Sequence, residues 1–394
     1  MRICVVGPTY PYRGGIAHYT TLLVKHLREA GHWTRLYSFT RQYPRWLFPG
    51  KTDKDTSTAP LKVDCEYILD PVNPITWWRL YRKVRADAPD ILLLQWWVPY
   101  WTPCLTAISR WIKRNTNIPI VYICHNVVPH EGGGALDRRL AMTVLRQGDA
   151  FIVHSEQDRL RLHALLPQVS VLKAPIPTYA DLAQQSTPVA CNDLRGQLGL
   201  PDDRPIALFF GFVRPYKGLE HLVQALPLVL QKLPIHLLVV GEFWTSPEFY
   251  RRYAREFGVE HAVSFVNRYV PNEDLRAYFD LADVVVLPYI SATQSAVVQL
   301  AFGFGKPVIT TRVGGLHEVV HDGVNGLVVP PQDEAALANA IVRYFVEQLQ
   351  APFQERICAD QGQHLFSWSA LVQGIATISA DLSMSRKSER PNSS

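Results

Sequence analysis

Residues 206–218 read Ile206-Ala-Leu-Phe-Phe-Gly-Phe-Val-Arg-Pro-Tyr-Lys-Gly218. A short apolar run passes at once into a glycine-containing turn, and a helical pattern covers 217–232. An apolar run bounded by turn residues is typical of a buried strand, and a strand that leads directly into a helix is the unit of a parallel sheet. The stretch therefore predicts one strand–turn–helix unit of a doubly wound α/β domain.

The same alternation extends in both directions along the 394 residues. It predicts strands at 3–7, 34–38, 91–95, 119–124, 150–154, 170–173, 206–211, 235–241, 263–266, 284–288, 307–310 and 326–329. It predicts helices at 15–31, 76–87, 103–115, 137–147, 156–166, 217–232, 247–257, 272–281, 295–303 and 333–348. Two series of this kind indicate an α/β protein with two Rossmann-like doubly wound domains facing across a cleft.

A stretch rich in turn residues separates the two series. Residues 176–205 contain several prolines and no strong period, so we interpret them as a linker or hinge between domains at 1–175 and 206–382. The last C-terminal helix can pack back on the N-terminal domain, and we expect 383–394 to be a disordered tail. Ligands of open α/β sheets bind at the carboxyl ends of the strands, so functional residues should follow strands directly.

The composition excludes several classes of protein. Hydrophobic residues make up 47% and charged residues 19%, which is typical of a globular chain. No window approaches 18 consecutive apolar residues, so we expect no spanning helix, and the first residues do not resemble a signal peptide. The six cysteines show no CxxC spacing. Reduced thiols in a cytoplasmic protein are therefore the expectation.

The two parts of the chain differ in charge. Residues 1–180 hold 23 basic and 13 acidic side chains and eight of the ten tryptophans, whereas residues 181–394 hold 17 basic and 22 acidic ones. Tryptophan favours the bilayer interface and basic residues favour anionic lipid. One hypothesis is peripheral contact with the inner face of the membrane through Arg45, Trp46 and Phe48 of the polar loop at 41–60. The alternative is that the tryptophans belong to the core of the N-terminal half.

Two glycines follow the first predicted strand, in Pro8-Thr-Tyr-Pro-Tyr-Arg-Gly-Gly-Ile-Ala-His-Tyr19. Gly14 and Gly15 lie at a strand-to-helix turn, where backbone N–H groups can approach an anion and the helix dipole favours one. The spacing is not GxGxxG, and no acidic residue near position 38 is placed to bind a ribose, so a nicotinamide cofactor is disfavoured. An ordinary glycine turn is the alternative.

The quoted stretch itself places two cations after its strand. Arg214 and Lys217 stand three residues apart at the cleft edge, with Gly218 behind them and a helix beginning there. Two cations beside a helix N-terminus suit a diphosphate. Two ordinary surface charges are the alternative.

A polar loop after the strand at 284–288 offers a second helix start. Ser291, Thr293 and Gln294 lie in this loop, and Ser295 can cap the following helix, whose first-turn N–H groups can accept phosphate oxygens. Gln299 stands one turn further on the same face. A capped core helix behind a polar loop is the alternative.

At this point the chain resembles a known family. The stretch 211–218, the run from Ala301 to Pro331 and, more weakly, the opening Gly14-Gly15 with His125-Asn126 are similar to the retaining GT-B glycosyltransferases of family four, group 1. The resemblance is strong over about 205–345 and weaker over 1–175. It implies two Rossmann-like domains, with a nucleotide-sugar donor on the C-terminal domain and an acceptor on the N-terminal one.

One departure from the family's pattern stands out. The family commonly carries a Glu-x7-Glu pair that holds the donor sugar and the donor ribose, and Ser291 and Gln299 occupy those positions here. Gln299 can still hydrogen-bond ribose hydroxyls, because an amide both donates and accepts, but Ser291 supplies no carboxylate. By the same resemblance His125 contacts the donor sugar and the reacting centre. The alternative for His125 is a strand-end histidine bonded to backbone.

No metal is expected. Asp53-Lys54-Asp55 matches the Asp-x-Asp of the other major glycosyltransferase fold, but it lies in a lysine-flanked polar loop and not after a strand. No cluster of His, Cys, Asp or Glu has convincing metal spacing.

The sequence thus predicts a metal-independent, retaining glycosyltransferase with His125, Arg214 and Lys217 as catalytic residues and no cofactor besides its nucleoside-diphosphate-sugar substrate. The hydroxyl acceptor is a sugar or a lipid-linked molecule, and the product a cell-surface polysaccharide or glycolipid. A catalytically silent nucleotide-sugar-binding protein and a nucleotide-sugar epimerase remain as alternatives. No nucleic-acid-binding motif accompanies the basic half.

Overall fold

The computed structural model describes residues 1–394 except 45–49, 51, 128–133, 186–190, 362–365 and 389–394. In the described residues the N-terminal sheet has seven parallel strands in the order β3-β2-β1-β4-β5-β6-β7. Their bounds are β1 (Arg2–Val6), β2 (Trp33–Phe39), β3 (Glu66–Leu69), β4 (Ile91–Trp96), β5 (Ile120–Cys124), β6 (Ala150–Val153) and β7 (Ser170–Lys173). The helices between them are α1 (Gly15–Glu29), α2 (Pro74–Asp87), α3 (Thr102–Asn115), α4 (Ala135–Leu145) and α5 (Glu156–Leu165), with the 3-10 helix η2 (Pro99–Trp101).

The second sheet, again counted over the described residues, has six parallel strands in the order β10-β9-β8-β11-β12-β13. They are β8 (Ile206–Phe210), β9 (His236–Val240), β10 (Val263–Val266), β11 (Val284–Leu287), β12 (Val308–Thr311) and β13 (Gly326–Val329). Its helices are α8 (Leu219–Leu230), α9 (Pro247–Glu256), α10 (Leu275–Leu281), α11 (Ala296–Gly303), α12 (Glu334–Val346) and α13 (Gln350–Gln361). Short 3-10 helices are η3 (Pro215–Lys217), η4 (Glu260–Ala262), η5 (Asn272–Asp274) and η6 (Leu316–Glu318).

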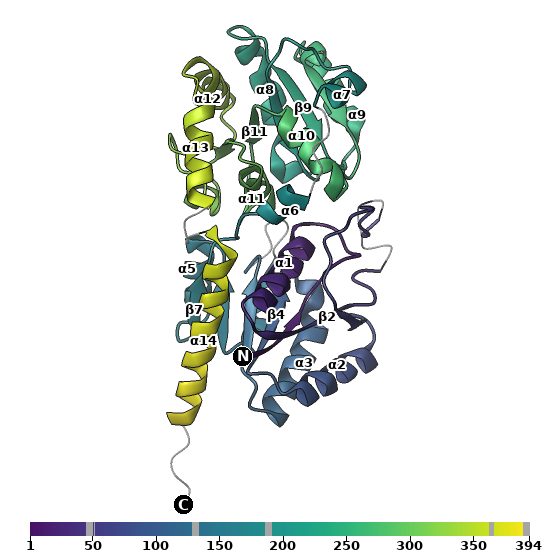
Figure 1. Ribbon diagram of the computed structural model, residues 1–394, viewed down its shortest axis with the longest axis vertical. Coiled ribbons are helices and arrows are strands. Elements are labelled where there is room, and N and C mark those ends of the chain that lie inside the picture. Colours follow the sequence, from purple (N-terminus) through teal and green to yellow (C-terminus); the bar gives the residue numbers. More distant parts are fainter. Residues whose placement is uncertain (45–49, 51, 128–133, 186–190, 362–365, 389–394) are drawn as a thin grey trace, which may run out of the picture.

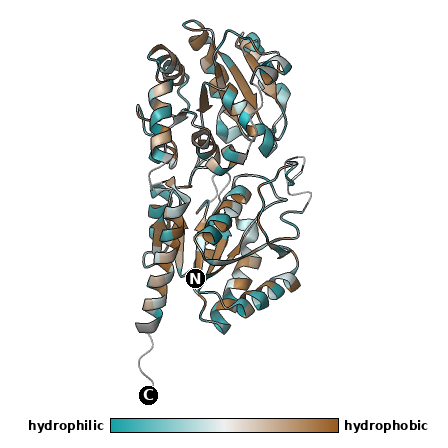
Figure 2. Ribbon diagram, viewed as in Figure 1, coloured by the Kyte–Doolittle hydropathy of each residue, from teal (hydrophilic) through white to brown (hydrophobic). Residues whose placement is uncertain are grey.

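The two sheets lie one above the other, each between helices (Figure 1). Figure 2 shows their strands as hydrophobic and the outward faces of many helices as hydrophilic. β4, β5, β8 and β9 are buried along their whole length, because a parallel sheet covered by helices on both faces leaves neither face in water. The predicted α/β class with two doubly wound units is confirmed.

Three details differ from the expectations. The edge strand β3 was not predicted, since Glu66-Tyr-Ile-Leu69 is short and its outer residues are polar or exposed. The segment interpreted as a linker contains α6 (Ala180–Gln185) and α7 (Cys191–Gln197). Helix α14 (Trp368–Ser388) continues six residues into the segment expected to be a tail.

Helix α14 lies along the N-terminal domain, on the same side of the molecule as α13 and below it in the view of Figure 1. It packs against α1, and Gly374 approaches β7 so closely that an added Cβ would lie 2.6 Å from Leu172 Cδ2. Arg386 near its end bonds Asp149 at 3.0 Å. The chain therefore crosses between the domains twice, once through α6 and α7 and once ahead of α14.

Candidate functional site

A cavity of about 500 Å³ lies between the two domains. Its walls are formed by the loops that follow β1, β4, β5, β8, β9, β10 and β11, so it lies where the carboxyl ends of both sheets meet, as expected for parallel α/β sheets. A volume of this size is ordinary for a small-molecule or cofactor site. Of the predicted residues, those that line it are Gly14, Gly15, His125, Arg214, Lys217, Thr293, Gln294 and Ser295.

Lys217 and Arg214 stand on the turn between β8 and α8. Lys217 ends η3 and is buried, and Gly218, in a left-handed conformation at φ 64°, turns the chain into α8. Gly211 makes room for the lysine, because a Cβ there would lie 3.0 Å from Lys217 Nζ. Burial, and then the nearby charge of Arg214, lower the pKa of Lys217 to about 7. The Arg214 guanidinium lies over the Trp244 ring, 4.9 Å from its centroid.

Two helix N-termini meet at this cavity from opposite domains. Helix α1 begins at Gly15, and α11 begins after Ser295, whose hydroxyl accepts the N–H of Val297 at 3.2 Å. A Cβ on Gly15 would lie 2.7 Å from the Ala296 Cβ, so glycine alone permits this approach of the two ends. Each end presents backbone N–H groups and the positive end of a helix dipole.

Ser291 and Gln299 lie behind the wall and do not line the cavity. Gln299 is fully buried, and neither its amide oxygen nor its amide nitrogen has a hydrogen-bond partner in the part of the chain that the structure describes. Ser291 is half-buried, and its backbone N–H is 3.4 Å from the Tyr216 carbonyl. A buried amide without a hydrogen-bond partner is costly, so packing alone does not explain a glutamine at this position.

His125 follows β5 and lines the cavity from the N-terminal domain. Its Nε2 lies 2.5 Å from Gln95 Oε1, and the rings of Tyr19 and His154 have centroids 4.9 and 5.2 Å away. Burial, and then His154, hold the pKa of His125 well below its usual value. The ring is therefore neutral at physiological pH and can both donate and accept a hydrogen bond.

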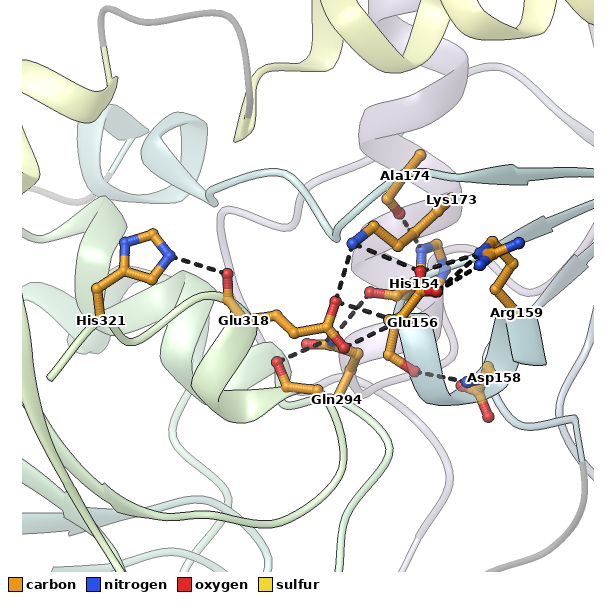
Figure 3. A network of polar contacts seen from close by, with 11 residues as sticks. His154, Glu156, Asp158, Arg159, Lys173, Ala174, Gln294, Glu318 and His321 are labelled. Carbon is orange, nitrogen blue, oxygen red and sulfur yellow. Dashed lines mark hydrogen bonds and ion pairs between the residues drawn. The ribbon is translucent and has the colours of Figure 1, made fainter. Parts of the chain in front are cut away.

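Polar contacts between the domains surround Gln294, in the loop between β11 and α11 (Figure 3). Gln294 Nε2 donates to the His154 carbonyl at 2.8 Å. The Glu318 carboxylate accepts the N–H of Glu156 at the start of α5 at 2.8 Å, and Lys173 Nζ lies 3.2 Å from it. The amide nitrogen of Gln294, predicted to bind a donor, is thus used to join the domains. Thr293 does the same, since its hydroxyl donates to Asn126 Oδ1 at 2.7 Å.

One feature of the cavity was missed by the motif analysis. Arg13 of the β1 loop forms a two-pronged ion pair with Glu242 of the β9 loop, with both N–O distances 2.8 Å and the side chains 3% and 4% exposed. Arg13 also lies over the rings of Phe212 and Tyr269, at 5.2 and 5.0 Å. Glu242 directly follows a predicted strand, and that position was the available signal.

The described residues contain no group of three or more His, Cys, Asp and Glu side chains placed to hold a metal. Asp53 and Asp55, of the Asp-x-Asp sequence, support their own loop. The Asp53 carbonyl accepts the N–H of Arg13 at 3.1 Å, and Asp55 Oδ1 accepts the N–H and the hydroxyl of Ser57 at 2.9 and 2.5 Å. Within the described ranges no helix is both long and apolar enough to cross a membrane.

Two family models match the chain and together span well over half of it. The model described as "Glycosyl transferases group 1" matches residues 204–346, and "Glycosyl transferase 4-like domain" matches residues 14–175. A D-inositol 3-phosphate glycosyltransferase of Corynebacterium aurimucosum is 27% identical over 301 residues, which cover 72% of this chain and 70% of that protein. A protein of the same name from Streptomyces griseus is 30% identical over 65% of this chain and 56% of its own length.

Solved structures with the same architecture cover almost the whole chain. A sucrose-phosphate synthase of Thermosynechococcus elongatus aligns with a TM-score of 0.70 at 24% identity, over 98% of this chain and 100% of that one. The Anabaena protein HepE in complex with UDP aligns with a TM-score of 0.70 at 19% identity, over 97% of this chain and 100% of that one. These likenesses confirm the GT-B arrangement of the two domains. The chain therefore belongs to the group 1 glycosyltransferases.

Proposed function

We propose that the protein is a retaining glycosyltransferase that moves a sugar from a nucleoside-diphosphate-sugar to a hydroxyl group of an acceptor, in the synthesis of a cell-surface polysaccharide or glycolipid. The observation that carries the proposal is the convergence of Lys217, Arg214 and the first turns of α1 and α11 on one cavity. Negative charge develops on the diphosphate as it departs from the sugar. Fixed positive groups at that place lower the barrier without a metal.

Retention is proposed from what the cavity offers as a base. Inversion needs an enzymic group that takes the acceptor's proton on the face opposite the leaving group, and histidines and carboxylates are the usual bases. Among the described lining residues the carboxylate is that of Glu242, which is committed to Arg13, and we assign the neutral His125 to a hydrogen bond with a sugar hydroxyl. The departing diphosphate oxygen can take the proton of the acceptor hydroxyl instead. Because this oxygen lies on the face of the sugar that it leaves, the acceptor attacks that same face and the configuration is retained.

A uridine donor is the first to test, since HepE, which shares the fold, is described as binding UDP and UDP-glucose. Gln299 supports a ribose contact through its amide oxygen and amide nitrogen, neither of which has a partner among the described residues. Because Gln299 is fully buried, this contact requires its side chain to turn toward the cavity.

The proposal predicts nucleotide release and sugar transfer in the presence of EDTA. Purified protein is incubated with UDP-glucose or GDP-mannose, and released nucleotide and sugar products are measured with and without chelator. A bound nucleotide at about 100 times its Kd should also stabilise the fold by roughly 2.7 kcal/mol. Thermal stabilisation without turnover would indicate a silent nucleotide-sugar-binding protein, and an epimerised sugar would indicate an epimerase. Loss of turnover in EDTA with rescue by Mn²⁺ would contradict metal independence.

We further propose that the N-terminal domain contacts an anionic membrane. Arg45, Trp46 and Phe48, named from the sequence, lie outside the described residues. The described chain supports the idea through α2, α3 and α4, which lie side by side over one face of the sheet. These helices and their ends carry exposed basic side chains at Arg79, Arg82, Arg85, Arg110, Lys113, Arg114, Arg138, Arg139 and Arg146.

Few acidic groups oppose this charge. Within the described residues Lys113 alone of the nine has an acidic partner, Asp149 at 3.0 Å. Apolar side chains are exposed in the first turns of α2 and α4, with Ile75 61% and Leu136 68% exposed. Exposed apolar groups on helices that carry many arginines suit contact with a bilayer, where each basic residue is worth about 1 kcal/mol.

The membrane proposal predicts binding to anionic vesicles that weakens in salt. Arg79→Glu, Arg82→Glu and Arg85→Glu combined should lower co-sedimentation with phosphatidylserine-containing vesicles at least tenfold, because three attractive charges become repulsive. The matched control reverses Arg251, Arg252 and Arg255, which are similarly exposed on α9 of the other domain. An equal effect of both triple variants, or no binding by the wild type at low salt, would contradict a membrane face on α2–α4.

A further inference from the structure

Gln95 is a polar side chain in an otherwise apolar strand. It stands in β4, Ile91-Leu-Leu-Leu-Gln-Trp96, and is 1% exposed. Its amide nitrogen has no hydrogen-bond partner among the described residues. A leucine would fill this interior without the cost of an unpaired buried polar group. Packing alone therefore does not explain why an amide is buried here.

The other half of the amide has a specific partner. Gln95 Oε1 lies 2.5 Å from His125 Nε2, and the backbone ladder sets up this contact. β4 and β5 pair in parallel, and the His125 N–H donates to the Trp96 carbonyl at 2.9 Å. The end of β5 thus places the imidazole beside the end of β4, with the carboxamide oxygen aimed at the ring.

The chain also makes space for this amide at the end of β1. An added Cβ on Gly7 would lie 2.5 Å from Gln95 Cγ and 3.1 Å from Thr20. Gly7 is not among the glycines with a positive φ, so its backbone conformation does not require glycine. The close approach of Gln95 therefore explains why this position has no side chain. Three neighbouring strands therefore cooperate, with β1 clearing the space, β4 carrying the acceptor and β5 carrying the imidazole.

We propose that Gln95 is a positioning residue that holds the His125 ring in the Nε2–H tautomer and so leaves Nδ1 as the acceptor for a hydroxyl of the donor or acceptor sugar. A carboxamide oxygen can only accept, so the Nε2 facing it must carry the proton. The second ring nitrogen then bears the lone pair. The proposal rests on the proposed function insofar as His125 touches substrate, but the tautomer itself does not depend on turnover.

The titratable groups that face the ring from other elements leave it neutral. Tyr19 comes from α1, and burial raises its phenol pKa well above the usual value. His154 follows β6, and its Nδ1 bonds the Ala174 carbonyl at 2.8 Å. Burial lowers the His154 pKa to about 4. Among these neighbours Gln95 is the hydrogen-bonding partner of His125, so the tautomer follows from this one contact.

The experiment compares the wild type with Gln95→Glu, Gln95→Leu and Gly7→Ala. Imidazole nitrogen shifts in ¹⁵N-histidine-labelled protein, assigned through loss of the His125 signal in His125→Ala, report the tautomer without substrate. The pH dependence of kcat/KM reports its consequence. Gln42→Leu, which removes another buried amide of the same domain, is the matched control.

The wild type should show a single Nε2–H tautomer and no fall of kcat/KM on the acid side between pH 8 and 6, because the ionisation of Lys217 lowers kcat/KM only on the alkaline side. Gln95→Leu should show both tautomers and a kcat lowered 10- to 100-fold, with donor KM changed less than threefold. Gln95→Glu places a carboxylate beside the imidazole, which raises the His125 pKa. The fall of kcat/KM on the acid side should then occur at a pH at least one unit higher than any such fall in the wild type. Gly7→Ala should weaken kcat in the same way, because its Cβ displaces the amide.

Several results would overturn the proposal. One is an unchanged His125 tautomer in Gln95→Leu, and another is an acid limb in Gln95→Glu that matches the wild type. A mixed tautomer with wild-type kcat would show that the position of the ring has no role in transfer. If the wild type transfers no sugar at all, the proposed function fails, while the nitrogen shifts still decide whether Gln95 holds the ring.

Discussion

Replacing Lys217 with alanine is expected to lower kcat/KM by about 30- to 1,000-fold. Loss of one preorganised group at a developing charge typically costs about 2–4 kcal/mol of transition-state stabilisation. Lys217 is buried at the cavity wall, so its ammonium acts in a water-poor place where charge interactions are strong. The measurement is steady-state transfer from the donor identified in the assay above. Arg214→Ala should act in the same direction.

The pKa of Lys217 gives this prediction a pH signature. Its value of about 7 in the ligand-free chain means that the amine is largely neutral at pH 8. A bound diphosphate favours the charged form, so binding at pH 8 takes up a proton, and donor affinity should fall as pH rises above 7. Calorimetry in buffers of different ionisation enthalpy detects that proton, and Lys217→Ala should abolish the uptake.

Lys232→Ala is the control for the lysine, because Lys232 is exposed just beyond α8 in the same domain. It should leave both kcat/KM and proton uptake unchanged. Wild-type kcat/KM in Lys217→Ala would remove this residue from the catalytic set.

Breaking the Arg13–Glu242 pair is expected to destabilise the fold by about 3–5 kcal/mol. Arg13→Met leaves the buried Glu242 carboxylate with the Trp244 Nε1–H at 3.2 Å but without the two guanidinium N–H groups at 2.8 Å, and a buried charge that has lost its counter-ion is strongly unfavourable. Urea denaturation of the ligand-free protein, followed by fluorescence, measures the loss. Adding Glu242→Leu should recover much of it, because replacing both charges with apolar groups removes the unpaired ion.

The exposed pair Arg251–Glu248 is the matched control. Its side chains are 47% and 68% exposed, so Arg251→Met should change stability by less than about 1 kcal/mol. If Arg13→Met behaves like this control, the buried pair does not hold the domains together. If the double variant is no more stable than the single one, the loss arises from something other than an unpaired carboxylate.

Much of the fold could be predicted because its signals are local. The run Leu92–Leu94 is buried in the sheet, and its apolar letters alone indicated β4. β3 was missed because an edge strand needs only one apolar face, and Tyr67 is 44% exposed. The helices α6 and α7 were missed because they are short and lie among the turn residues of 176–205.

The site, too, has residues that local sequence could place and contacts that it could not predict. Residues in the loops that follow strands, such as Lys217 and Ser295, could be placed at the cleft because the direction of a strand determines at which edge of the sheet its loop lies. The pairing of Arg13 with Glu242 joins residues 229 positions apart, and no local pattern carries that information. The use of Gln294 in a contact between domains was hidden for the same reason.

Hydrophobic periodicity and turn chemistry act over a few residues, so the architecture and the polar residues at the strand ends could be predicted from the amino acids alone. Which of those groups face the cavity and which form contacts between the domains emerged only in the folded chain. The same holds for the amides of Gln95 and Gln299, which are buried with atoms that have no hydrogen-bond partner among the described residues. The physical reason is that burial and hydrogen-bond partners depend on which loops of two separate domains come together.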